Sequence, residues 1–412
     1  MNLFYDGLET RTHKERADDQ LRRLKSQVKH AASNSSFYRD VLANSGEINE
    51  LADLTKLPVT RKSDLLDGQK NNPPFGGLNG SRPDQLLRVF MSPGPIADPE
   101  GHGRDWWRMG RAIYAAGFNN KDIALNCFSY HHTPAGHMME TGAHAVGCVV
   151  FPGGVGQSEA QVDAISHYGI NGYIGTPDFL KIILDKADEL GRDISSLKKA
   201  FVSGGALFPS MRTEYKRRGV DVVQGYGTAD LGLVAYESPA MEGMIIDEGV
   251  IVEILRPGTG DPVSDGEVGE VVVTLLDNRD YPLIRFATGD LSAILEGTSL
   301  CGRTNKRIKG WMGRADQRTK VKGMFIDPVQ IDRVVKAYPE IIKARLDVAF
   351  IDNADQMTLK VEVEGGDENL TALIAESLQK ECKLKGAVDL VEIGSLENDG
   401  LVIKDTRDYD QS

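Results

Sequence analysis

Apolar positions in the first part of the chain recur with the spacing of a helix. Leu21, Leu24, Val28 and Ala32 lie three or four residues apart within residues 12–45, which predicts an amphipathic helix against a core. From about residue 122, short apolar runs alternate with longer helix-like segments. The apolar runs are DIALNCF, CVVFP, INGYIGT, LKKAFVSGG and VDVVQGYG. Such alternation predicts a largely parallel sheet with helices on both faces, whose site residues gather at the carboxyl ends of the strands.

The pattern changes in residues 249–294, where strand-like runs are separated by turn residues, and it predicts an antiparallel sub-domain there. A further group of elements follows residue 313. We predict strands over 320–326, 344–351, 357–363 and 388–393, and helices over 328–337 and 368–381. The expected fold class is therefore α/β, with a large multi-sheet N-terminal domain and a small α+β C-terminal domain.

Composition excludes several classes of function. The chain has 412 residues, which predicts two or three domains. Its net charge of −12 argues against a nucleic-acid partner, and no run approaches the roughly 18 apolar residues of a membrane span. The four cysteines contain no Cys-x-x-Cys pair, so we expect a cytoplasmic protein without a cysteine-based metal site.

One stretch, RVFMSPGPIADPEGHGRDWW, has the layout of a phosphate-binding loop. An apolar run ends in a turn at residues 92–95, and a helix-compatible stretch begins near Arg104. Strand, glycine turn and helix together can hold a phosphate. However, Pro93, Pro95 and Pro99 have no N–H to donate, and Asp98 is negative. The residues alone leave open whether this turn binds phosphate.

Six stretches in chain order resemble the phenylacetate–CoA ligase branch of the adenylate-forming enzymes. They are DLTKLPVTRKSDLLD, FSYHHTPAGHMMETGAHAVG, VSGGALFPSMR, QGYGTADLG, YPLIRFATGDL and GRADQRTKVKGMFIDPVQID. The resemblance implies activation of an aromatic carboxylic acid by ATP as an acyl-adenylate, followed by transfer to coenzyme A or another small nucleophile. It also implies a cytoplasmic homodimer, an adenylation domain over residues 1–315 and a mobile lid domain over residues 316–412.

The resemblance also assigns roles to individual residues. Asp290 would accept hydrogen bonds from the ribose, with Arg314 on the ribose and phosphate side. Asp230 would hold magnesium, His131 and His132 would line the carboxylate pocket, and Asp316 would be the hinge. The adenine would lie among Ser203, Gly204, Gly205, Ala206, Gly225, Tyr226, Gly227 and Thr228. Taken singly, Asp290 could close a turn and the histidine pair could be structural.

The chain departs from this family on the phosphate side. Where the family reads Ser-Ser-Gly-Thr-Thr-Gly-Lys-Pro, residues 92–99 read SPGPIADP, which places Asp98 where a lysine would meet the β- and γ-phosphates. Ala229 replaces a serine or threonine, and Leu401 stands where the adenylation lysine is expected. Lys404 is the nearest substitute. The alternatives are therefore a non-catalytic protein that binds AMP or an acyl-adenylate, and a ligase that forms an amide or ester without coenzyme A.

Overall fold

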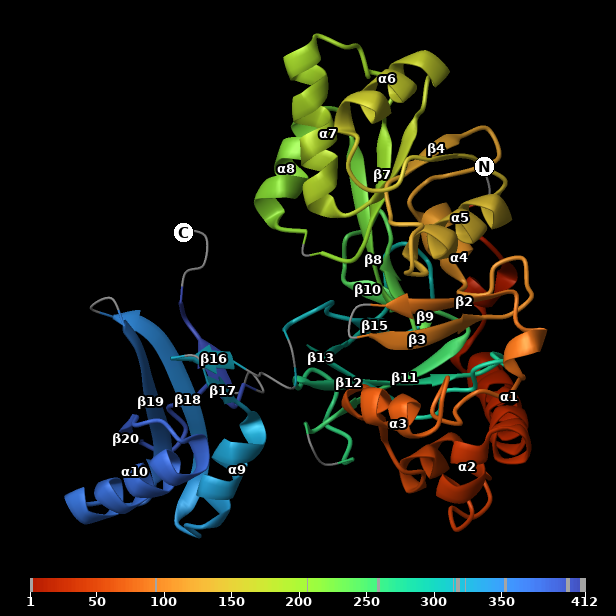
Figure 1. The fold of residues 1–412 in the computed structure, drawn as a ribbon. Helices are drawn as coiled ribbons and strands as arrows, with labels where there is room; N and C mark the ends of the chain where they lie inside the picture. The colour runs from red at the N-terminus through yellow and green to blue at the C-terminus, as the bar shows by residue number, and fades with distance from the viewer. Residues whose placement is uncertain are drawn as a thin grey trace.

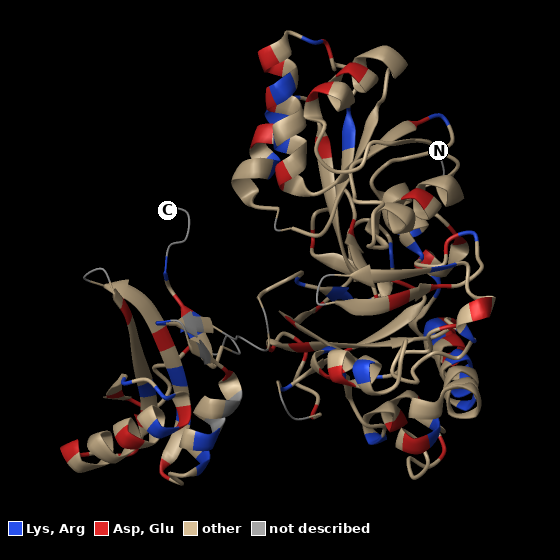
Figure 2. Cartoon of the chain, in the orientation of Figure 1, with Lys and Arg blue, Asp and Glu red and all other residues tan. Residues whose placement is uncertain are grey.

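The chain forms a larger N-terminal body and a smaller group of C-terminal elements, drawn in blue in Figure 1. The computed structural model describes residues 3–92, 95–205, 207–257, 260–313, 315, 319–322, 324–351, 354–397 and 401–407. Within these ranges, every helix is too short or too polar to cross a lipid bilayer. In Figure 2, the positions of Lys and Arg (blue) and of Asp and Glu (red) are interspersed along both groups of elements.

The predicted N-terminal helix is confirmed, but it is broken in two. Helix α1 covers His13–Asn34 and α2 covers Ser36–Val41. Thr12 and Glu15 form a capping box that begins α1, and the hydroxyl of Ser35 accepts the N–H of Tyr38 to begin α2. Short helical segments follow at Leu51–Lys56, Lys62–Asp64, Leu65–Asn71 (α3) and Pro83–Gln85, after an earlier one at Gly7–Thr10.

The predicted parallel sheet is also confirmed. Among the described residues, nine strands pair in the order β14-β15-β10-β9-β8-β7-β6-β4-β5, and the run β8-β7-β6-β4-β5 is parallel. In that order the strands are Ile294–Leu295, Arg307–Ile308, Met244–Ile246, Gly232–Glu237, Asp221–Thr228, Lys199–Val202, Gly172–Gly175, Ile123–Asn126 and Val149–Pro152.

Helices cover both faces of this sheet because successive strand side chains point to opposite faces. Phe201 packs with α4 (Met109–Ala115) and α5 (Ala135–Val146). Its neighbours Ala200 and Val202 pack with α6 (Ser158–Tyr168), α7 (Pro177–Leu190) and α8 (Pro209–Arg217). Figure 1 shows α7 and α8 on one side of β7 and α4 and α5 on the other.

A second sheet has the order β1-β13-β12-β11. Strands β11 (Val250–Leu255), β12 (Gly269–Leu275) and β13 (Phe286–Ser292) are antiparallel, as predicted for residues 249–294. Strand β1 (Thr60–Arg61) adds a parallel partner to β13 from the N-terminal region. The second sheet therefore brings the segment around residue 60 close to the Thr288–Asp290 motif.

The expected strand before the turn at residues 92–95 is confirmed, but the helix expected near Arg104 is not. Strand β2 (Arg88–Ser92) is followed by a second strand, β3 (Ile96–Glu100), which pairs antiparallel with it. Ser92 lies opposite Ile96, and Phe90 lies opposite Asp98. Helix α4 begins only at Met109. The loop is thus the tip of a β-hairpin, and no helix N-terminus follows the turn.

The C-terminal elements enclose a separate apolar core, whose buried members lie between Val321 and Ile403. Helices α9 (Pro328–Lys336) and α10 (Glu368–Cys382) pack on a sheet of order β20-β19-β18-β21. Its strands are Ala387–Val391, Ala354–Val363, Ile341–Ile351 and Ile403–Asp405. Two expectations are corrected: residues 320–326 form the hairpin β16 (Thr319–Val321) and β17 (Met324–Ile326), and β21 was not foreseen.

Candidate active site

Three of the parallel strands end beside one another. Phe128 follows β4, Thr176 follows β6, and Ser203 and Gly204 follow β7. A side chain at Gly204 would lie 3.5 Å from the Phe128 ring and 3.9 Å from the methyl group of Thr176, and Gly204 has φ +73°. The Ser203 hydroxyl donates to the carbonyl of Gly225 on β8 (2.9 Å). The loops after these strands therefore form one surface at the carboxyl edge of the sheet.

Tyr226 and Asp290 come from different sheets and meet at this edge. The Tyr226 hydroxyl donates to Asp290 Oδ2 at 2.8 Å and lies 3.2 Å from Thr288 Oγ1. A Cβ at Gly225 would lie 2.6 Å from the Phe201 ring, so the flanking strand requires glycine there. The structure thus brings together two residues that the sequence assigned separately to adenine and ribose.

Trp311 also contacts Asp290, and the sequence interpretation missed it. Its indole N–H donates to Asp290 Oδ1 at 3.1 Å. Asp290 itself is buried. Trp311 belongs to no regular pattern of apolar positions. In the sequence, the position of Trp311 three residues before Arg314 is the one feature that could have indicated a place at the site.

Asp230 lies behind this edge and is paired with a lysine. Lys62 Nζ contacts Asp230 Oδ2 at 2.5 Å, and the Asp230 side chain is fully buried. Its other oxygen has no hydrogen-bond partner among the described residues. Nearby, the Thr228 hydroxyl accepts the N–H of Leu231 at 3.2 Å. The ammonium group thus occupies a position on the carboxylate that a cation would take.

Around Asp230, the described residues do not form a magnesium site built from protein ligands alone. Magnesium requires several oxygen ligands in octahedral geometry. In the part of the chain that the structure describes, no cluster of three or more His, Cys, Asp or Glu side chains could hold a metal. We therefore assign no step to a metal at Asp230.

Asp98 does not face outward as expected. It is fully buried in β3, and neither carboxylate oxygen has a hydrogen-bond partner within the described ranges. Burial, followed by the negative charge of Asp230, raises the pKa of Asp98 to about 7. The same surroundings raise the pKa of Tyr281, first by burial and then through Asp230. The position aligned with the family's lysine therefore does not present a charged side chain at the surface of the hairpin, because the carboxyl group of Asp98 is buried.

The histidine pair lies in the loop after β4. His131 and His132 are both exposed, and the carbonyl of His132 accepts the N–H of Met91 on β2 at 2.8 Å. The histidine loop is thus attached to the hairpin by its backbone.

A more enclosed histidine lies nearby. The His137 ring is 5.5 Å from that of Phe90 and 5.2 Å from that of Tyr130. Burial, followed by the positive charge of Arg88, lowers the pKa of His137. The Tyr130 hydroxyl donates to Glu140 at 2.7 Å. This aromatic cluster of Phe90, Tyr130 and His137 was not foreseen from the sequence.

Three further predicted residues, Ala206, Arg314 and Asp316, lie outside the described residues. Lys404 lies on β21, where its ammonium pairs with Glu397 at 3.1 Å. Strand β21 pairs parallel with β18 in the C-terminal sheet. Lys404 thus belongs to the C-terminal elements, whereas Tyr226 and Asp290 belong to the N-terminal body.

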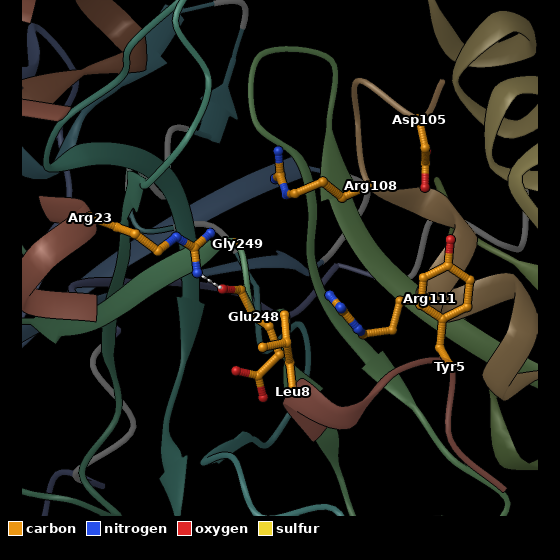
Figure 3. A pocket seen from close by; sticks show the side chains of 8 residues that line it. All are labelled: Tyr5, Leu8, Arg23, Asp105, Arg108, Arg111, Glu248 and Gly249. Carbon is orange, nitrogen blue, oxygen red and sulfur yellow. Dashed lines mark hydrogen bonds between the residues drawn. The ribbon is translucent and has the colours of Figure 1, made fainter. Parts of the chain in front are cut away.

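A cavity of about 180 Å³ under the N-terminal segment is separate from these residues (Figure 3). Arg108 and Arg111 both pair with Asp247, at 3.0 and 2.7 Å. Arg23 donates to the carbonyl of Glu248 at 2.8 Å. Because these arginines are neutralised by aspartates, including Asp6 of the N-terminal segment on Arg111, the cavity is part of a structural charge network that fixes this segment.

Comparison with known proteins supports a nucleotide-dependent function. Residues 103–274 match the family described as AMP-binding enzyme. The phenylacetate–coenzyme A ligase of Aromatoleum evansii is 30% identical over 388 residues, covering 88% of this chain and 86% of that protein. The phenylacetate–coenzyme A ligase of Escherichia coli (strain K12) is 30% identical over 393 residues, covering 90% and 87%.

A solved structure confirms the α/β fold class. The structure of 2-hydroxyisobutyryl-CoA ligase in the postadenylation state, in complex with R3-HIB-AMP, matches with a TM-score of 0.73. The match covers 99% of this chain and 93% of that chain, at 23% identity. At this identity the likeness shows the fold.

Proposed function

We propose a reaction for this chain from the premise that it belongs to the phenylacetate–coenzyme A ligase family of AMP-binding enzymes. It acts as an AMP-forming acid–thiol ligase. A carboxylate oxygen of the acid attacks the α-phosphorus of ATP, and pyrophosphate leaves. The sulfur of coenzyme A then attacks the acyl carbon of the acyl-adenylate, and AMP leaves. We propose an aromatic acid as substrate.

The meeting of Tyr226 and Asp290 is the observation that carries the proposal. Asp290 accepts the ribose hydroxyls, and the Tyr226 ring lies against the adenine together with Ser203, Gly204 and Gly205. An ionised carboxylate forms strong hydrogen bonds with hydroxyl donors when it is partly shielded from water. The protein's contribution to such a reaction is mainly to position the reactants and stabilise charge.

The loop after β4 supplies the acyl pocket in this proposal. His131 or His132 lies at the carboxylate, and the cluster of Phe90, Tyr130 and His137 provides apolar and aromatic surface nearby. Aromatic side chains favour edge-to-face or offset contacts with an aryl group. This is why we favour an aryl acid over a short aliphatic one.

The C-terminal elements act in both half-reactions. We propose a lid domain over residues 316–412 that rotates about Asp316 after adenylation. Lys404 is the cation that reaches the carboxylate and α-phosphate in the first step. Coenzyme A, or an amine or hydroxyl of a small molecule, then enters. ATP is used with magnesium from solution, and the protein is a cytoplasmic homodimer.

A protein that binds AMP or an acyl-adenylate without forming it is the second candidate. The pairing of Lys62 with Asp230 favours it, because the acid predicted to hold magnesium is already neutralised. The hairpin at residues 88–100 favours it as well, since its residues 92–99 read SPGPIADP and lack the threonines and lysine of the family's phosphate loop. Both features affect the triphosphate side and spare the adenosine side.

Exchange of labelled pyrophosphate into ATP, with a panel of aryl acids, separates the two candidates. A ligase gives acid-dependent exchange, whereas a binding protein gives none with any acid while still binding AMP. Lys404→Ala should lower exchange at least about tenfold and leave AMP affinity unchanged. Lys360→Ala is the matched control, because it removes a similarly exposed, ion-paired lysine of the same sheet (38% against 37%). Equal exchange in both variants would remove Lys404 from the mechanism.

A further inference from the structure

Trp311 has a contact that the proposed function does not use. Its indole N–H reaches the same carboxylate that we assign to the ribose, so the following inference rests on the proposed nucleotide site. Trp311 donates to Asp290 Oδ1 at 3.1 Å, and the Tyr226 hydroxyl donates to Oδ2 at 2.8 Å. The two donors come from separate segments and hold the carboxylate from its two oxygens.

The backbone fixes the position of Trp311. Met312 N donates to the carbonyl of Leu291 at 2.9 Å, and Leu291 N donates to the carbonyl of Gly313 at 2.8 Å. The hydroxyl of Ser292 donates to the carbonyl of Gly310 at 2.7 Å. Residues 310–313 therefore run beside β13 and are joined to it by backbone hydrogen bonds. Trp311 is held at Asp290 by this pairing and not by its side chain alone.

The ring of Trp311 remains 55% exposed although its N–H is bonded. The other two tryptophans differ: Trp107 is fully buried, and Trp106 is partly buried against it. Backbone hydrogen bonds and the indole hydrogen bond already fix the Trp311 ring. A ligand that packs on this ring therefore loses little conformational entropy of the protein. The exposed ring of Trp311 lies beside Asp290, the carboxylate that we assign to the ribose hydroxyls.

We infer that Trp311 is a positioning residue for the nucleotide. Its N–H orients the Asp290 carboxylate toward the ribose hydroxyls, and the bound nucleoside covers part of its exposed ring. A carboxylate can accept about four hydrogen bonds, and donors that come from two sides of Asp290 fix the plane of its carboxylate. Removal of the indole N–H lets the carboxylate rotate and weakens its contacts with both hydroxyls.

The test compares AMP with 2′,3′-dideoxy-AMP by calorimetry. The wild type should prefer AMP by roughly tenfold or more, since hydrogen bonds to a charged group are lost in the dideoxy ligand. Trp311→Phe keeps a ring and removes the donor, and it should reduce this preference to roughly threefold or less. Affinity for the dideoxy ligand should stay unchanged. Trp311→Gln keeps an N–H donor and should retain more of the preference.

Trp106→Phe is the matched control, because Trp106 also donates its indole N–H to an aspartate, Asp280, at 3.0 Å. It should leave the preference for AMP intact. Tryptophan fluorescence gives a second measurement, since the chain has only three tryptophans. The change in emission on adding AMP should persist in Trp106→Phe and disappear in Trp311→Phe.

Failure of the inference can be distinguished from failure of the proposed site. If Asp290→Ala leaves both AMP affinity and the preference unchanged, the ribose assignment itself is wrong. If Asp290→Ala abolishes the preference and Trp311→Phe does not reduce it, Trp311 has no positioning role. If Trp311→Phe loses affinity equally for AMP and for 2′,3′-dideoxy-AMP, the inference is also overturned. If Trp311→Phe does not fold, Trp311→Gln and the fluorescence of Trp106→Phe decide.

Discussion

At the scale of single residues, Asp98 has the most unusual surroundings of the acids near the site. It is buried without a hydrogen-bond partner in the described part of the chain, close to the negative Asp230 and the positive Lys62. Because its pKa is raised to about 7 in the folded protein, the folded state binds more protons than the unfolded state between about pH 4 and 7. Ionisation of Asp98 therefore opposes folding.

This gives a prediction for stability against pH. The contribution of protonated Asp98 to the free energy of unfolding is fully present below about pH 4. It is lost as the pH rises toward about 7, by at most about 1.4 kcal/mol per pH unit. Asp98→Asn removes this titration, so the variant should be more stable than the wild type at pH 8, and the difference should shrink at pH 4. Urea unfolding at several pH values measures it.

The control for this prediction is Asp84→Asn, which changes an aspartate whose side chain is 66% exposed. The hydrogen bond with Arg82 lowers the pKa of this acid below its usual value, so its replacement should not produce a gain in stability at high pH. An Asp98→Asn variant whose stability follows the wild type in parallel from pH 4 to 8 would show that Asp98 does not titrate in this interval.

At the scale of elements, the hairpin β2–β3 carries the segment that resembles the family's phosphate loop in position but not in residues. The N–H of Ala97 donates to the side chain of Gln69 at 2.7 Å, and the carbonyl of Ala97 accepts from it at 2.9 Å. Pro95 and Pro99 have no N–H. A phosphate loop depends on free backbone donors and hydroxyl groups, and this hairpin offers few of either.

We therefore predict that AMP binds at least as tightly as ATP with magnesium. Pro95 is the position to change, because it is exposed and its replacement by threonine restores both an N–H and a hydroxyl. Pro95→Thr should raise ATP affinity by roughly tenfold, the lower end of the scale of one hydrogen bond to a charged group, and leave AMP affinity unchanged. Calorimetric titration of both ligands tests this. Tenfold tighter binding of ATP than AMP in the wild type would contradict the prediction.

Asp98 is not a suitable position for a substitution that is meant to restore phosphate binding. A lysine there would be buried beside Lys62, and a second ammonium group without solvent is costly. The structure therefore changes which substitution on the hairpin is informative. The exposed tip can be altered, whereas the strand beneath it belongs to the core.

The sequence predicted the elements with strong periodicity and missed the short ones. The alternating strands and helices from β4 to β8 were foreseen because their apolar runs and glycine turns agree. Strand β3 was missed because Pro99 lies within it, and proline is rare in strands outside edges and ribbons. Strand β21 has three residues, too few for any pattern.

The candidate site was foreseen in part for a similar reason. Tyr226 and Asp290 lie in motifs that resemble a family, so their roles were assigned without knowing that they touch. The Lys62–Asp230 pair and the Trp311 contact join segments far apart in the chain. No local pattern records such pairs, because they depend on how the two sheets meet.

At the scale of the whole molecule, the chain has apolar cores that share no residues. Those of the N-terminal body reach no further than Ile308, and that of the C-terminal elements begins at Val321. Units with separate cores often unfold separately. Tyr226 and Asp290, for which we propose a role in nucleotide binding, lie in the first unit, so AMP should stabilise that unit alone.

We predict two thermal transitions in the full-length protein, of which AMP shifts one. At a concentration of 100 times Kd, AMP adds about 2.7 kcal/mol to the unit that binds it. Leu346, fully buried on β18, should affect the other transition. Leu346→Ala removes about 2–5 kcal/mol and should lower the midpoint of the smaller unit by roughly 10 °C or more. Scanning calorimetry with and without AMP measures both shifts.

The matched variant is Leu125→Ala, which empties a fully buried position on β4. It should lower the AMP-sensitive transition and leave the other in place. Leu346→Ala should also keep AMP affinity while pyrophosphate exchange declines, because Lys404 lies on β21 beside the altered strand. A single transition that AMP, Leu125→Ala and Leu346→Ala all move would show one cooperative unit, and a lid that rotates about Asp316 would then lose its physical basis.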